Sequence, residues 1–268
     1  MRTIAIANQK GGVGKTTTAI NLGAGLARLG HSVLLIDLDP QGNSTVGIGV
    51  NLNKIKATAC EVMLSECELS EAVVALDQEH LHVVPSNVDL AAADVQLMQR
   101  IGREGILRKA LATVADQFEF VLVDCPPSLS LLTVNALTAA DGVLIPIQCE
   151  YFALEGLTSL LDTVEQIRAT VNPHLEIEGL VRTMFDIRNN LSTEVSRQLT
   201  EHFGDKVFRT VVPRNVRVAE APSYGMPVVD YDPESRGAAA YTGLAGEFMR
   251  RQEQRAQLMK AGGEHGHA

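Results

Sequence analysis

NQKGGVGKTT, at residues 8–17, is the stretch of this sequence that decides the fold. A short apolar run at residues 2–8 comes before it, and a segment with helical spacing follows at residues 15–30. Between a strand and a helix, a glycine-rich loop of this kind closes its backbone N–H groups around phosphate oxygens. The stretch departs from the pattern G-x-x-x-x-G-K-[ST], because Gln9 stands where the first glycine belongs and a second lysine, Lys10, follows it.

The residue types in this loop fit the chemistry of a bound nucleotide. Glycines let the backbone approach phosphate, the Lys15 ammonium reaches the outer phosphates, and the Thr16 hydroxyl is suited to bind Mg²⁺ directly. A glycine turn that only caps a helix is the alternative, which the spacing strongly disfavours. We therefore expect the loop to hold phosphates through Gly11, Gly12, Val13, Gly14, Lys15, Thr16 and Thr17.

Outward from the loop, short apolar runs alternate with helical patterns. The runs are continuously apolar, which is typical of strands buried on both faces of a parallel sheet. They predict an α/β fold, a doubly wound, mostly parallel sheet with helices on both faces and a ligand crevice at the carboxyl ends of its strands. One domain is expected over residues 1–250, followed at 251–268 by the end of a helix and a flexible tail. The expected strands are 2–8, 32–39, 81–87, 118–127, 141–150, 176–186 and 206–214, with a helix at 152–171.

The composition is that of an ordinary soluble protein. The chain has 268 residues, of which 46% are hydrophobic and 21% charged, values inside the usual globular range. It contains no run of about 18 apolar residues that would predict a membrane span. The N-terminus lacks the pattern of a secretory signal, so we expect a cytoplasmic location. The four cysteines form no C-x-x-C pair and are expected to be reduced thiols.

Charge is divided unevenly along the chain. The formal net charge is −9, which taken alone argues against nucleic acid as a partner. Residues 181–217, however, hold seven basic and four acidic side chains. A stretch of this kind is often only a solvated face, but it also provides a basic segment that could bind an anionic partner.

Carboxylates follow two of the predicted strands. Asp124 ends the apolar run FVLVD, where it is placed to hold Mg²⁺ through the water shell of the ion. Asp37 and Asp39 lie two apart on an extended segment, so we expect both side chains to point the same way. Asp39, expected as the last residue of its strand, is the candidate for positioning the attacking water and for a second water-mediated contact with Mg²⁺. A simple turn at Asp39-Pro40 is the alternative.

Five motifs together resemble the ParA/Soj family of chromosome- and plasmid-partitioning ATPases, a branch of the P-loop ATPases with a deviant Walker A loop. The resemblance extends from about Thr3 to Glu247. The loop alone would indicate only the wider group, whereas the later motifs are specific to the chromosomal branch. The motifs are KGGVGKTT (10–17), LLIDLDPQGN (34–43), VDCPPSL (123–129), QCEYFALEGL (148–157) and PRNVRVAEAPSYGMP (213–227).

The resemblance implies ATP and Mg²⁺ as cofactors, and roles for individual residues. Lys10 matches a signature lysine that crosses a dimer interface to touch the phosphates of the partner's ATP, and it joins Lys15 and Asp39 as a catalytic candidate. Thr16 matches the direct Mg²⁺ ligand and Asp124 the second metal-associated carboxylate. The adenine contacts would be Met184, Pro213 and Asn215, and the DNA contacts Arg188 and Arg217.

The function implied is that of an ATP-switched partition protein. An ATP-bound homodimer would bind double-stranded DNA without sequence preference, and slow hydrolysis stimulated by a ParB-type centromere-binding partner would release it. A cytoplasmic, nucleoid-associated protein without a membrane partner is expected. The alternatives are a metabolic ligase or reductase, a nucleotide-stabilised scaffold, and a membrane-positioning ATPase of the MinD type. A MinD-like protein needs a C-terminal amphipathic helix, for which Phe248, Met249, Leu258 and Met259 are too sparse.

Overall fold

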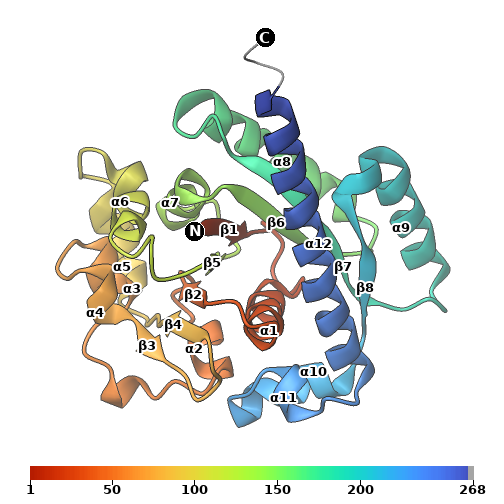
Figure 1. The fold of residues 1–268 in the computed structure, drawn as a ribbon, viewed down its shortest axis with the longest axis horizontal. Coiled ribbons are helices and arrows are strands. Elements are labelled where there is room, and N and C mark those ends of the chain that lie inside the picture. Colours follow the sequence, from red (N-terminus) through yellow and green to blue (C-terminus); the bar gives the residue numbers. More distant parts are fainter. Residues whose placement is uncertain (265–268) are drawn as a thin grey trace.

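An eight-stranded sheet forms the centre of the computed structural model, which describes the backbone of residues 1–264 and the side chains of residues 1–258. The strand order is β3-β4-β2-β5-β1-β6-β7-β8, and every neighbouring pair is parallel except β3 with β4 (Figure 1). The strands are β1 (Arg2–Ile6), β2 (Val33–Asp37), β3 (Val74–Ala75), β4 (Leu81–Val84), β5 (Phe120–Asp124), β6 (Gly142–Gln148), β7 (Glu176–Phe185) and β8 (Val207–Pro213).

Helices cover both faces of this sheet, which confirms the predicted fold class. The α-helices are α1 (Lys15–Arg28), α2 (Asn43–Gly47), α3 (Ala59–Met63), α4 (Leu69–Ala72), α5 (Leu90–Leu97), α6 (Ile106–Ala112), α7 (Leu131–Ala139), α8 (Ala153–Thr170), α9 (Asn190–Phe203), α10 (Val216–Glu220), α11 (Val228–Tyr231) and α12 (Arg236–Glu264). Four short 3-10 helices are η1 (Leu52–Lys54), η2 (Arg103–Gly105), η3 (Gly204–Lys206) and η4 (Ala221–Tyr224).

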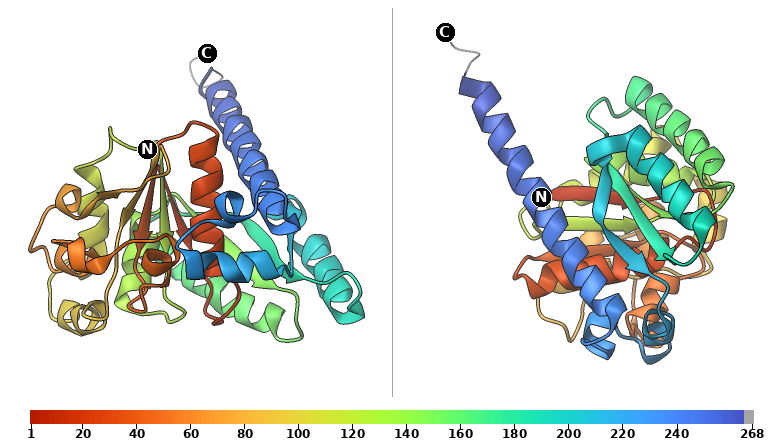
Figure 2. Two further views of the ribbon diagram at one scale, coloured as in Figure 1. Left: turned by 90° about the horizontal axis from the view of Figure 1, so that it is seen from below. Right: turned by 90° about the vertical axis from the view of Figure 1, so that its right-hand side faces the viewer.

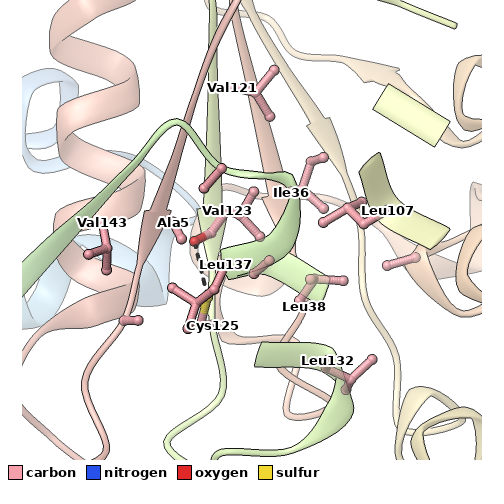
Figure 3. Packing of buried hydrophobic residues seen from close by; sticks show 14 of the residues in the cluster. Ala5, Ile36, Leu38, Leu107, Val121, Val123, Cys125, Leu132, Leu137 and Val143 are labelled. Carbon is pink, nitrogen blue, oxygen red and sulfur yellow. Dashed lines mark hydrogen bonds between the residues drawn. The ribbon is translucent and has the colours of Figure 1, made fainter. Parts of the chain in front are cut away.

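Two hydrophobic clusters, one on each face, hold the layers together. Alternate residues of a strand point to opposite faces, so Ala5 joins one cluster while Ile4 and Ile6 join the other. The first cluster packs against α3 to α9, and Figure 3 shows part of it around Cys125. The second packs against α1 and α12, which lie side by side (Figure 2). Burial of both strand faces explains why the strands read as continuously apolar.

The predicted strands all form, with ends that differ by a few residues. The antiparallel edge strand β3 was not predicted, because two residues are too short to show a pattern. All four cysteines are free, as expected. Helix α12 passes residue 250 without a break and extends beyond the body of the domain (Figure 2), while residues 265–268 of the predicted tail lie outside the described residues. Within residues 1–264, no helix is both long and apolar enough to cross a membrane.

Candidate nucleotide-binding site

The loop between β1 and α1 is already shaped to receive an anion. Gly12 and Gly14 have φ of 73° and 86°, a left-handed conformation that costs other residues about 1 kcal/mol or more. Gly14 precedes the first turn of α1, and its carbonyl accepts a hydrogen bond from the Thr18 amide at 2.9 Å. The Val13 carbonyl accepts another from the Thr183 hydroxyl at 2.7 Å, which fixes the loop to β7. The free N–H groups at the start of α1 therefore face the cleft in a fixed arrangement.

A cleft of about 670 Å³ opens above this loop at the carboxyl ends of the strands. That volume is typical of a small-molecule site. Lys10, Val13 and Asp124 do not line the cleft, since Val13 and Asp124 are buried and Lys10 lies outside. Ten of the predicted site residues do line it, namely Gly11, Gly12, Gly14, Lys15, Thr16, Thr17, Asp39, Met184, Pro213 and Asn215.

Lys15 lies almost completely buried at the floor of the cleft. Its Nζ donates a hydrogen bond to the Lys10 carbonyl at 3.2 Å. Burial lowers the pKa of Lys15, while the negative charge of Asp124 acts in the opposite direction. An ammonium held in this way gains most from an additional anion, because little water remains to solvate it.

Asp124 and Asp37 lie in register at the ends of the adjacent strands β5 and β2. One oxygen of Asp124, Oδ2, accepts a hydrogen bond from the Ser44 hydroxyl at 2.8 Å. The other, Oδ1, is buried and has no hydrogen-bond partner within the described part of the chain. Burial first, and then the charge of Asp37, raise the pKa of Asp124 to about 7. An orphaned carboxylate oxygen of this kind fits the water shell of a divalent cation.

The side chain of Asp37 holds a neighbouring helix in place. Its Oδ2 accepts hydrogen bonds from the amide and the hydroxyl of Thr45, at 2.8 and 2.7 Å. Burial raises its pKa to about 6, even though these hydrogen bonds act in the opposite direction. The Asp37 side chain therefore anchors α2 beneath the cleft and does not face a ligand.

Asp39 differs from its prediction in position. Strand β2 ends at Asp37, so Asp39 is not its last residue, and only Asp39 of the two lines the cleft. The chain leaves the sheet at this point because the Asp39 amide donates to Asp37 Oδ1 at 3.1 Å. Asp39 Oδ1 accepts a hydrogen bond from the Gln41 amide at 3.0 Å. Asp39 thus starts a turn, as the alternative interpretation held, and that turn also brings its carboxylate into the cleft.

The two unusual residues of the loop, Gln9 and Lys10, contact the segment that follows β6. Lys10 Nζ forms an ion pair with Glu150 Oε2 at 2.6 Å. The Gln9 carbonyl Oε1 accepts a hydrogen bond from the Ser159 hydroxyl of α8 at 3.1 Å. Sequence reasoning missed Glu150 as a partner of Lys10, although Glu150 belongs to the motif QCEYFALEGL.

The far end of the cleft lies where β7 and β8 end. Met184 has φ of 48°, an uncommon value for a non-glycine residue, and lies near the end of β7, where the register with β8 shifts between Arg182 and Phe185. Asn215 Oδ1 accepts hydrogen bonds from the amides of Arg217 and Val218, so the side chain caps α10 while it lines the cleft. Val218, Pro222 and Met226, which were not predicted, add apolar surface here. An apolar wall of this kind is suited to pack against the flat ring of a ligand.

The predicted DNA-contacting arginines lie near this end and are both paired with carboxylates. Arg188 binds Asp186 at 2.8 Å. Arg217 binds Glu220 at 2.8 Å and Asp232 at 3.1 Å. A third arginine of the basic stretch, Arg182, donates instead to the backbone carbonyls of β8. The basic stretch is therefore partly neutralised by the chain's own carboxylates, and its role toward DNA stays a prediction.

Comparison with known proteins places the chain among partition ATPases. A family model described as AAA domain matches residues 1–177. The chromosome partitioning protein ParA of Caulobacter vibrioides is 51% identical over 95% of this chain and 96% of its own length. The sporulation initiation inhibitor protein Soj of Bacillus subtilis is 49% identical over 92% and 97%. Cobyrinic acid a,c-diamide synthase from Mycobacterium smegmatis, solved with ADP and magnesium, has a TM-score of 0.83 and 38% identity over 94% and 96%.

Of these three proteins, the two partition proteins have the higher identities, 51% and 49% against 38%, and all three matches span almost the whole chain. The chain therefore belongs to the ParA/Soj family of chromosome-partitioning ATPases.

Proposed function

We propose that this protein is an ATP-switched partition ATPase in which two ATP-bound subunits join face to face, hold DNA without sequence preference and release it after hydrolysis. The observation that carries the proposal is the difference between its two loop lysines. Lys15 lies buried in its own cleft, whereas Lys10 lies outside that cleft on the surface. One subunit therefore offers an ammonium that its own nucleotide site does not use.

The residues of the cleft fit ATP and Mg²⁺. The N–H groups of the loop and the Lys15 ammonium would hold the phosphates, and the Thr16 hydroxyl would bind the ion directly. Asp124 Oδ1 and Asp39 would contact the water shell of the ion. When bound, Mg²⁺ neutralises charge that develops on the phosphates. The neighbouring structure solved with ADP and magnesium supports this assignment.

Dimerisation would bring Lys10 of each subunit to the nucleotide of the other. The ion pair of Lys10 with Glu150 is exposed, with 37% and 47% of the two side chains accessible. Exposed ion pairs contribute only about 0–1 kcal/mol, so the ammonium can exchange Glu150 for the phosphates of a partner. Exposed Tyr151 and Phe152 follow Glu150 and would add apolar contact area at the same place.

Hydrolysis would be directed by Asp39. Its carboxylate lines the cleft and is held by the Gln41 amide, which suits it to position a water for attack on the γ-phosphorus. We propose that this reaction is slow alone and is stimulated by a ParB-type centromere-binding partner. The relatives named for chromosome partitioning support such a cycle.

DNA binding would use Arg188 and Arg217. Both are exposed, and their carboxylate partners lie on the surface as well. Phosphates can replace such weakly held partners, and neutralisation of phosphates provides most of the affinity in non-specific binding. A single subunit offers few contacts, so firm binding requires the dimer. A cytoplasmic, nucleoid-associated location follows from this proposal.

The test is DNA binding by the purified protein with ADP and with ATP, repeated over a series of salt concentrations. We expect ATP-dependent binding whose affinity falls steeply with salt. Arg217→Ala should lower affinity and salt slope together. Arg168→Ala, which removes a similarly paired arginine from α8, is the matched control and should bind normally. Binding that ignores the nucleotide would contradict the proposal.

An amide-forming synthase is the second candidate, because the solved structure with 38% identity described above is a diamide synthase. It predicts ATP consumption that depends on a small carboxylic acid and is indifferent to DNA. The higher identity to the partition proteins favours the first candidate. ATP turnover measured with DNA, and separately with cobyrinic acid and an amide donor, separates the two.

A further inference from the structure

Six of the eight residues of helix α5 are apolar, the exceptions being Asp94 and Gln96. Leu90, Ala93 and Leu97 are buried in the hydrophobic cluster beneath it. The helix lies on the outside of the domain beside α3 (Figure 1), so its other apolar residues face away from that cluster.

Large exposed apolar side chains form a stripe over α5 and the turns that flank it, with Val95 on the helix itself and the others just before and after it. Val88, Val95, Met98 and Ile101 are 74%, 63%, 55% and 104% exposed. The spacing of Val88, Val95 and Met98, with the exposed Ala92 between them, is that of one side of a helix. Single exposed apolar residues need no explanation, but a contiguous group of them marks an interaction site.

The chain segment that carries most of this stripe is acidic. Residues 57–99 contain no lysine or arginine. Beside Ile101, a groove of about 590 Å³ runs between the α3–α4 turn and the segment that joins α5 to α6. Glu66, Glu68 and Glu71 line the groove, with Arg100 and Lys109 at its other side. The acidic residues of the stretch are Glu61, Glu66, Glu68, Glu71, Asp77, Glu79, Asp89 and Asp94.

We propose that this surface binds a cationic amphipathic helix of a partner protein. We call it the α5 docking face and define it as Val88, Val95, Met98 and Ile101 together with the glutamates Glu66, Glu68 and Glu71. The stripe supplies the apolar contacts of a helix in a groove, and the glutamates supply charge complementarity to lysine or arginine.

A second copy of this chain is the less suitable occupant. In a two-fold contact the same patch lies on both sides, so the acidic segments at residues 57–99 of the two copies would come together. The resulting repulsion disfavours self-association through this face. The α5 docking face lies outside the nucleotide cleft, so the proposal does not depend on the DNA-binding cycle.

The probe is a synthetic, fluorescently labelled helix of about 18 residues with leucines on one side and lysines on the other. Its control has the same composition with the two residue types dispersed. Fluorescence anisotropy with the full-length protein should show tighter binding of the amphipathic peptide. Val95→Asp should weaken that binding at least about tenfold, the loss expected from one apolar anchor. Ile101→Asp, at a fully exposed position that cannot disturb the core, should act in the same direction.

These substitutions separate docking from simple attraction of charges. Each adds a carboxylate, which would strengthen binding of a cationic peptide if attraction alone were responsible. Replacing Glu66, Glu68 and Glu71 together by glutamine should lower the salt dependence. Leu258→Asp is the matched control, because Leu258 is equally exposed on the distant α12, and this variant should bind normally. Equal affinity of all variants, equal affinity for both peptides, or a change only in self-association on sedimentation would each overturn the proposal.

Discussion

At the scale of single residues, the loop carries two ammonium groups, those of Lys10 and Lys15, in different surroundings. Lys15 is held by burial next to Asp124, and its hydrogen bond goes to the backbone of its own loop. Lys10 reaches away from the cleft to Glu150 on the surface. The first is built to bind within its own subunit. The second is held weakly enough to change partners.

Lys10→Ala should leave ATP binding within a few-fold of the original and remove ATP-dependent dimers. The reason is that the cleft of the variant keeps every group that lines it. A fluorescent ATP analogue measures the binding, and sedimentation with ATP measures the dimer. Glu150→Gln is the matched control, since it breaks the same ion pair but keeps the ammonium, and it should still dimerise. Full dimerisation of Lys10→Ala would contradict the proposal that Lys10 binds the nucleotide of the partner subunit.

Asp39→Ala should lower phosphate release by about 10²-fold or more, the usual cost of losing a group that directs proton transfer or attack. Nucleotide binding should persist, because Asp39 contacts neither the loop nor Lys15 through a hydrogen bond within the described residues. Steady-state phosphate release and ATP binding are the two measurements. An unchanged rate would assign the attack to a different group.

At the scale of elements, α1 and α12 pack closely against each other. A Cβ added at Gly25 would lie 2.8 Å from the Ala245 Cβ. Gly25→Ala should therefore destabilise the fold by about 1–3 kcal/mol, as overpacking does. Gly156→Ala in α8 is the control, because nothing lies within 4 Å of its added Cβ. It should gain about 0.5–1 kcal/mol from helix propensity. Urea unfolding of both variants checks the contrast, and equal effects would show that the two helices can separate freely.

The exposed edge of β8 is closed by Glu247 of α12. Its carboxylate accepts hydrogen bonds from the Arg209 and Thr210 amides, each at 2.8 Å. Burial alone would raise the pKa of Glu247, but these bonds and those from the Thr210 hydroxyl and Arg251 outweigh it and lower the pKa below 4.5. The stabilisation is therefore present above about pH 4.5 and is lost as pH falls through the lower folded-state pKa.

Glu247→Gln should lower the free energy of unfolding at neutral pH and make its decline in acid shallower. The glutamine keeps one acceptor oxygen but turns a donor toward the β8 amides. Urea unfolding at a series of pH values measures this. Glu253→Gln, on the exposed side of the same helix, should leave the profile unchanged. If the free energy of unfolding of Glu247→Gln fell as steeply in acid as that of the original chain, Glu247 would not be a cause of the acid dependence.

Elements differ in how much of them the sequence predicts. Strands β1, β2, β5 and β6 are readable because burial on both faces makes them almost continuously apolar. The loop was readable because phosphate binding restricts residue type and spacing together. Strand β3 was not readable, because its two residues are too few to show a pattern. The turn at Asp39 was readable only as an alternative to a strand end. The Lys10–Glu150 ion pair joins residues 140 positions apart, and no local pattern encodes that pairing.

At the scale of the whole molecule, the strand order places the acidic and the basic segments of the chain at different edges of the sheet. The acidic stretch of residues 57–99 carries β3 and β4, at one edge of the sheet. The basic stretch of residues 181–217 carries much of β7 and β8, at the opposite edge (Figure 1). The charge division expected from the sequence is therefore a division in space. An anionic partner and a cationic partner would approach opposite ends of the sheet.

The same view of the whole molecule predicts the behaviour of α12 toward membranes. Phe248 is completely buried and Met249 packs against the second cluster, so neither is available to lipid. Leu258 is exposed alone among polar neighbours, and the side chain of Met259 lies outside the described residues. A helix binds a lipid surface through a continuous apolar face, and α12 uses its apolar residues to hold α1 instead.

We therefore expect no flotation of the protein with anionic phosphatidylglycerol vesicles, whether ADP or ATP is present. A positive control supplies the continuous apolar face that α12 lacks. Gln254→Leu combined with Gln257→Leu places two leucines beside Leu258 on the exposed side of α12, without touching the residues that pack on α1. This double variant should float, because each added leucine contributes about 1.5–3 kcal/mol when buried in lipid. Flotation of the unchanged chain with ATP would place it with the membrane-positioning ATPases and would transfer the role of the nucleotide switch from DNA to lipid.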